Sequence, residues 1–195
     1  MRVSGTWANT TYFPQTEHAL ADPLAGFGSV LTRQQWRGVI AFSKAVDARI
    51  VTSFATGAGT RDTDGAWTSD QGRRLMDFTR SAGGRIAAAE WMNEPTLAVM
   101  GGAPAGYDAA AYGRDFKIFH AFAKQSAPDM LVLGPGSVGE TAGSWGVVSG
   151  YGSASLLRTR FSGRRRRRLL LPCRRLPFEP SARHEVSRTA EQASR

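Results

Sequence analysis

Hydrophobic positions along this chain alternate between short continuous runs and longer stretches with helical spacing. The continuous runs cover residues 2–7, 50–54, 86–92 and 130–133, and their length and composition predict β-strands. Between them, three stretches place apolar residues three or four positions apart, which predicts amphipathic helices. The expected order is β-α-β-α-β-α-β, which favours a parallel sheet covered by helices.

The predicted helices carry recognisable start signals. Thr32 with Gln35 forms a capping-box pattern before the first helix, and Thr68 with Gln71 forms a second one. The third helix is expected to begin after Asp108 and to end before the next proline. Two α/β folds fit this order: a doubly wound open sheet and part of a (β/α)8 TIM barrel. Hydrophobic spacing does not separate them, and both place functional residues in the loops that follow the strands.

The positive charge of the chain lies at one end. The whole sequence has a net charge of +9, and residues 158–195 contain twelve arginines and three glutamates, which account for all of it. We therefore expect a folded α/β part over residues 1–157 and an Arg-rich disordered tail over residues 158–195. The single cysteine, Cys173, excludes an internal disulfide. No signal-peptide pattern and no membrane-length apolar run occurs, so a cytoplasmic chain without a membrane span is expected.

The strongest candidate for chemistry is the loop after the third predicted strand, Trp91-Met92-Asn93-Glu94-Pro95. Barrel enzymes keep catalytic groups at the carboxyl ends of their strands. The apolar neighbours of Glu94 would favour its protonated form, which suits a general acid. Asn93 adds an amide that can hold a substrate hydroxyl. The alternative is an ordinary solvated glutamate in a turn.

Three segments resemble a known family. Residues 2–7 (RVSGTW), 89–95 (AEWMNEP) and 131–136 (LVLGPG) are similar to strands two, four and five of the heparanase-like glycoside hydrolases, family 79 of clan A. The resemblance covers residues 1–157 and implies a partial (β/α)8 barrel from a retaining enzyme that cleaves β-glucuronide linkages in glycans, without a metal or cofactor. It implies Glu94 as the acid/base and Asn93 and Thr6 as substrate-binding residues. Members of this family are often secreted.

Retaining hydrolysis requires a second carboxylate about 5–5.5 Å from the first. The resemblance places this nucleophile at the end of strand seven, which the matching segments do not reach. Glu90 lies four residues before Glu94, about 13 Å along a strand, and Glu140 is at a position that the family does not use. We therefore expect this chain to be inactive alone.

Other features leave alternatives open. The glycines of residues 134–139 match a nucleotide-binding pattern, but no helix is predicted after them. His18, His120 and His184 do not have metal-ligand spacing. Trp7, Tyr12 and Trp67 could stack on sugar rings or pack within the protein. These aromatic residues therefore do not decide the function by themselves.

The tail admits three interpretations. Five consecutive arginines, residues 164–168, could bind nucleic acid, which makes a small α/β domain with a nucleic-acid-binding tail the alternative function. The tail could also be solvated and without a ligand. Alternatively, the reading frame slips between about Leu157 and Arg164. In a GC-rich gene the neighbouring frame permits Asp-Val-Phe-Ser-Tyr-His, which is similar to strand six of the same family.

Overall fold

The computed structural model describes residues 1–17 and 22–136. Several predictions therefore lie outside the described residues: those on the tail (residues 158–195), on Glu140, on His18 and His184, and on the second half (residues 137–139) of the glycine pattern at residues 134–139. The described residues all belong to the first of the two units into which the chain divides, Met1–Gly163 and Arg164–Arg195.

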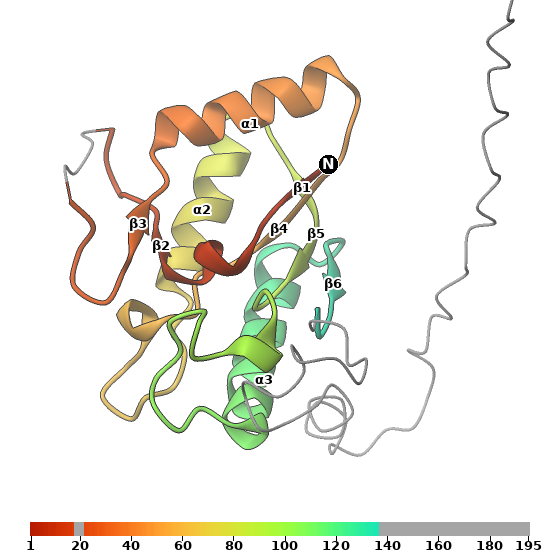
Figure 1. Cartoon of the computed structure of the whole chain (residues 1–195). Coiled ribbons are helices and arrows are strands. Elements are labelled where there is room, and N and C mark those ends of the chain that lie inside the picture. The colour runs from red at the N-terminus through yellow and green to blue at the C-terminus, as the bar shows by residue number, and fades with distance from the viewer. Residues whose placement is uncertain (18–21, 137–195) are drawn as a thin grey trace, which may run out of the picture. The chain divides into compact units, whose positions relative to one another are not determined.

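A four-stranded parallel sheet forms the centre of the fold. Its strands are β1 (Arg2–Val3), β4 (Ile50–Ser53), β5 (Ile86–Glu90) and β6 (Leu131–Leu133), which lie side by side in that order (Figure 1). The order of the strands in the sheet is thus their order along the chain. The predicted α/β class with a parallel sheet is confirmed.

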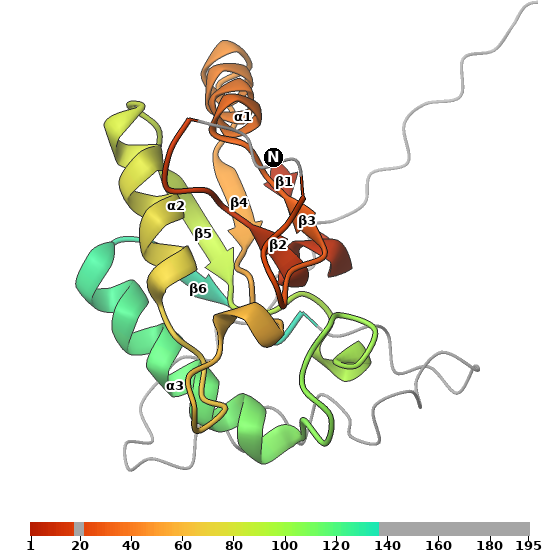
Figure 2. The same cartoon turned by 90° about the vertical axis from the view of Figure 1, so that its left-hand side faces the viewer.

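Three helices connect these strands: α1 (Arg33–Ala45), α2 (Asp70–Ser81) and α3 (Ala109–Ser126). Parallel strands joined through helices are connected with a right-handed crossover. Because the strands also advance across the sheet in one direction, the three helices pack along one face of it (Figure 2). No helix in the described residues is long and apolar enough to cross a membrane.

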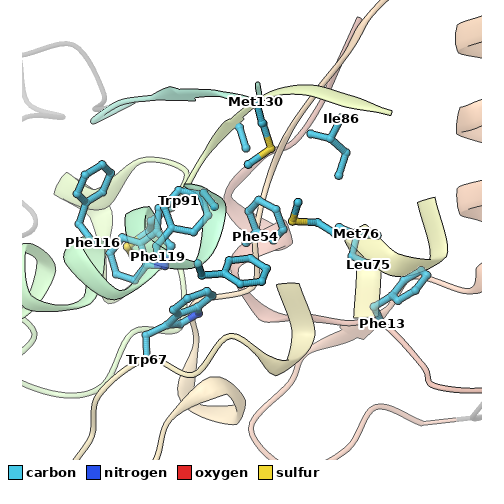
Figure 3. Packing of buried hydrophobic residues seen from close by; sticks show 14 of the residues in the cluster. Phe13, Phe54, Trp67, Leu75, Met76, Ile86, Trp91, Phe116, Phe119 and Met130 are labelled. Atoms are coloured by element: carbon cyan, nitrogen blue, oxygen red, sulfur yellow. The ribbon is translucent and has the colours of Figure 1, made fainter. Parts of the chain in front are cut away.

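The core fills the space between this face and the helices. Phe54, Trp67, Trp91 and Phe119 converge in one cluster with Phe122 of α3 (Figure 3). Trp67 contacts both Trp91 and Phe119, with ring centroids 6.3 and 5.9 Å apart. These aromatic contacts tie the loop after β4 and the end of β5 to α3.

The helix starts show where local signals decide the structure and where they do not. The capping box of Thr32 and Gln35 is present at α1, and Asp108 caps α3 as predicted. The prediction for α2 is wrong by one residue, because Ser69 is its N-cap. The Gln71 side chain accepts a hydrogen bond from the backbone N–H of Phe13 at 2.8 Å instead of closing a capping box.

The first predicted strand is too long. Only Arg2–Val3 is extended, and the chain then turns into the 3-10 helix η1 (Thr6–Thr10) after Gly5, whose φ is 145°. The following segment was expected to be a loop. It contains β2 (Thr11–Tyr12), which pairs in parallel with β3 (Ser29–Val30) in a second, two-stranded sheet. Strands this short carry too little periodicity to be predicted.

Two further 3-10 helices lie in the loops after the strands, η2 (Ala58–Thr60) after β4 and η3 (Pro95–Leu97) after β5. Glu94 directly precedes η3 and is its N-cap residue. The connections from the carboxyl ends of these strands to the next helices are therefore long segments that contain short 3-10 turns.

Candidate active site

The residues predicted for the site come together at the carboxyl edge of the sheet. Thr6 follows β1, Asn93 and Glu94 follow β5, and Gly136 follows β6. Parallel strands end at the same edge, so residues that are 88 positions apart in the sequence become neighbours: the Thr6 hydroxyl donates a hydrogen bond to Oε2 of Glu94.

Glu94 has an unusual backbone conformation. Its φ of 48° and ψ of 59° lie in the left-handed region, which residues other than glycine, asparagine and aspartate rarely adopt. Two hydrogen bonds hold it there. Its N–H donates to the carbonyl of Gly136 at 3.0 Å, and its own carbonyl accepts from the N–H of Leu97 at 2.8 Å. Such strain is typical of residues that the surrounding structure holds for a functional purpose.

The hydrogen bonds around Thr6 fix the direction of its proton. Nδ2 of Asn93 donates to Oγ1 of Thr6 at 3.2 Å, so this oxygen acts as an acceptor there. The single hydroxyl proton of Thr6 is then directed to the carboxylate of Glu94. Glu94 is half-buried and Asn93 is buried. The carboxylate is therefore oriented by a neutral donor and stays within reach of solvent.

Asn93 is held from several sides. Its backbone exchanges two hydrogen bonds with the side chain of Asn9, at 2.9 and 3.1 Å, and Asn9 is fully buried. Its side-chain oxygen accepts from Nη2 of Arg2 at 2.6 Å. That bond fixes which end of the amide faces Thr6. The nitrogen keeps a second proton that could bind a substrate hydroxyl.

Glu90 completes a polar cluster on the open face of the sheet. Its Oε1 accepts from Nη2 of Arg2 at 2.5 Å and from the hydroxyl of Ser4 at 2.8 Å. The other oxygen packs against Gly136, where an added Cβ would lie 2.2 Å from it. A continuous chain of hydrogen bonds thus runs from Glu90 through Arg2, Asn93 and Thr6 to Glu94.

Sequence reasoning missed Arg2, Ser4 and Asn9, because nothing local marks them as site residues. The available signal was the strand register. Arg2 pairs with Val51 and Glu90 pairs with Ser53, which places Arg2, Ser4 and Glu90 on the same face of the sheet by alternation. That register depends on tertiary structure and could not be predicted from the sequence alone.

A buried ion pair joins the loop after β4 to α3. Arg61, after β4, binds Oδ2 of Asp115 on α3, and both side chains are almost completely buried. The hydroxyl of Tyr107, before α3, donates to the same oxygen at 3.0 Å. Burial, followed by the negative charge of Asp115, raises the pKa of Tyr107 above its ordinary value of 10. The loops that frame the carboxyl edge are therefore locked together.

The aromatic candidates separate clearly by exposure. Tyr12 and Trp67 are buried, which excludes them as an open sugar-binding surface, whereas Trp7 is 72% exposed. Trp91 and Met92, beside Asn93, belong to the hydrophobic core. His120 lies on α3. No group of three or more His, Cys, Asp or Glu in the described residues is arranged to hold a metal ion.

Comparison of the chain with protein-family models and with curated proteins finds no match. The geometry of the site therefore carries the functional argument.

Proposed function

We propose that this chain carries the acid/base part of a retaining glycosidase site that hydrolyses β-glucuronide linkages, within a partial (β/α)8 barrel of the heparanase-like family. The observation that carries the proposal is the placement of Glu94. It is held in a strained left-handed conformation at the carboxyl end of β5, with its carboxylate oriented by Thr6.

The order of the strands supports the barrel over the doubly wound sheet. A doubly wound sheet reverses its strand order at a switch point and covers both faces with helices. Here the described strands run β1-β4-β5-β6 without reversal, and the helices between them pack on one face. The other face carries the polar cluster of Arg2, Ser4 and Glu90, as the interior of a barrel carries the inward side chains of its strands.

The proposed chemistry begins with Glu94 as a general acid. Its carboxylic proton passes to the glycosidic oxygen while the bond from that oxygen to the anomeric carbon breaks. A second carboxylate attacks the anomeric carbon and forms a covalent bond to it. Glu94, now a carboxylate, then removes a proton from the water that releases the sugar. Thr6 keeps Oε2 in place throughout, and the free proton of the Asn93 amide binds a substrate hydroxyl.

Glu90 does not supply the second carboxylate. Glu90 is the nearest acidic residue along the same strand, but its Oε1 is bound by Arg2 and Ser4, and its Oε2 packs against Gly136. It is therefore committed to holding the cluster together. We expect the chain alone to bind a glucuronide without hydrolysing it.

A small external nucleophile tests this proposal without a second carboxylate. Formate at about 1 M would attack the anomeric carbon of phenyl β-D-glucuronide while Glu94 donates its proton to the phenolic oxygen. We expect slow release of phenol that depends on formate and is lost in Glu94→Gln. Glu17→Gln is the matched control, since Glu17 is an exposed carboxylate paired with Arg37 away from the site.

Three outcomes are informative. Release that requires both formate and Glu94 supports the proposal. Release without formate that is lost in Glu94→Gln would show that the chain already contains a nucleophile, and the expectation of an inactive chain would be wrong. The absence of both release and binding of the glucuronide would refute the proposed function.

A further inference from the structure

Trp7 is the most exposed large hydrophobic residue in the part of the chain that the structure describes. It is 72% exposed, whereas Trp36, Trp67 and Trp91 are each at most 2% exposed. An indole in water leaves a large apolar area uncovered, which a ligand ring could cover. Exposure alone does not identify a ligand, so the position of the residue decides what it can bind.

The turn that carries Trp7 is rigid. The N–H of Ala8 donates to the carbonyl of Gly5 at 2.9 Å and closes the first turn of η1. The carbonyl of Trp7 accepts from the hydroxyl of Thr11 at 2.8 Å and from that of Thr10 at 3.3 Å. The backbone is therefore fixed before any ligand arrives, which lowers the entropy cost of binding to the indole.

Trp7 directly follows Thr6, the residue that orients Glu94. Successive Cα atoms are about 3.8 Å apart, so the indole begins one residue from Thr6, whose hydroxyl donates to the carboxylate of Glu94. Side chains that follow one another in a 3-10 helix point about 120° apart. The Trp7 and Thr6 side chains therefore leave η1 in different directions. A ligand ring on the indole would lie beside the ring at Glu94 rather than in its place.

We propose that Trp7 is a stacking platform for the ring on the leaving-group side of the scissile bond. The inference rests on the proposed function, because the leaving group is defined by the proton that Glu94 donates to it. The class of ligand is a pyranose or an aromatic ring. Both present a flat face with little polarity, which covers an indole while their polar atoms remain in water.

Two non-hydrolysable probes separate this inference from the proposed function. Phenyl 1-thio-β-D-glucuronide has a ring on the leaving-group side, and methyl 1-thio-β-D-glucuronide lacks it. Their dissociation constants are measured by calorimetry on the full chain. The part of the acrylamide quenching of tryptophan fluorescence that Trp7→Phe removes reports the exposure of the Trp7 indole, since the chain has four other tryptophans. The variants are Trp7→Ala, Trp7→Phe and Thr6→Val.

We expect Trp7→Ala to weaken the phenyl probe about tenfold and the methyl probe by less than about twofold. Trp7→Phe keeps an aromatic face and should stay within about threefold of the original chain for the phenyl probe. The phenyl probe should also protect the fluorescence from acrylamide. Phe42→Ala is the matched control, because Phe42 is a 56% exposed aromatic residue near the end of α1.

Equal weakening of both probes by Trp7→Ala would overturn the inference, and so would no weakening of either. In both cases the proposed function stands if Thr6→Val still weakens the methyl probe. If neither probe binds the original chain, the proposed function fails and the platform fails with it. Circular dichroism of each variant distinguishes a loss of binding from a loss of folding.

Discussion

The left-handed backbone of Glu94 makes a prediction about stability that does not depend on catalysis. We compare Glu94→Gly with Glu94→Ala. Both changes remove the carboxylate and its hydrogen bond from Thr6, so that loss cancels in the comparison. What remains is the backbone: φ is 48° and ψ is 59°, a conformation that glycine adopts without strain and alanine does not.

The magnitude follows from two opposing terms. A residue with a Cβ in the left-handed region costs the folded state about 1–2 kcal/mol, which glycine relieves. Glycine also gives the unfolded chain more freedom, which costs about 0.4–1 kcal/mol of stability. The midpoints of the two terms differ by about 0.8 kcal/mol, and the glycine variant should be more stable than the alanine variant by about that amount. With a denaturant slope of about 2 kcal/mol per molar urea, the midpoints should differ by about 0.3–0.5 M.

Urea unfolding followed by tryptophan fluorescence measures this difference, since Trp67 and Trp91 are buried in the core. Asp47 provides the control. Its φ is 49°, and it lies beyond the end of α1. The pair Asp47→Gly and Asp47→Ala should show the same sign. If the Asp47 pair differs and the Glu94 pair does not, Glu94 is not held in the left-handed conformation and the strain attributed to it is absent.

Three further changes follow from the packing and the buried charges. Gly136→Ala places a Cβ against the buried carboxylate of Glu90 and should cost about 1–3 kcal/mol of stability. Gly38→Ala is the control, because Gly38 lies on α1 with open space around it, and this change should stabilise the chain by about 0.5–1 kcal/mol. The urea midpoints of the two variants measure both effects. Asp115→Ala removes the ion-pair partner of the buried Arg61 guanidinium and should cost about 3–5 kcal/mol of stability. Asp77→Ala breaks an exposed ion pair and should cost less than about 0.5 kcal/mol. Equal losses of stability in the two variants would contradict the role of burial. The raised pKa of Tyr107 means that the folded state keeps its phenolic proton above pH 10, where the unfolded state loses it, so stability falls as the pH rises beyond 10. Tyr107→Phe should reduce that fall, and an unchanged slope of stability between pH 9 and about 11 would refute the assignment.

The elements that could be predicted from sequence are those decided by local interactions. The capping box of α1 and the Asp108 cap of α3 involve residues within one turn, and both are present. The start of α2 was mispredicted because Gln71 bonds to the backbone of Phe13, far away in the chain. That tertiary contact outweighs the local pattern.

The candidate site divides in the same way. Glu94 and Asn93 stand out in sequence because they end an apolar strand, and the family resemblance added Thr6. Their mutual hydrogen bonds depend on β1 and β5 ending at one edge of the sheet. The contribution of Arg2 depends on the register between β1 and β4, and no local property of an arginine near a chain start encodes it.

The order of strands in the large sheet also bears on how the chain folds while it is being made. β4 pairs with β1, β5 with β4 and β6 with β5, so β4, β5 and β6 each dock on a strand that the ribosome has already released. Successive strands are about 40 residues apart, which at about 5–20 residues per second gives each new strand roughly 2–8 s before the next appears. Helices form within about a microsecond, and the slower parallel pairing in small α/β domains takes about milliseconds. The sheet can therefore grow one βα unit at a time, and each new strand forms the edge of the sheet until the next one pairs with it. A delay in translation would prolong the exposure of the unpaired backbone groups of the strand that was added last.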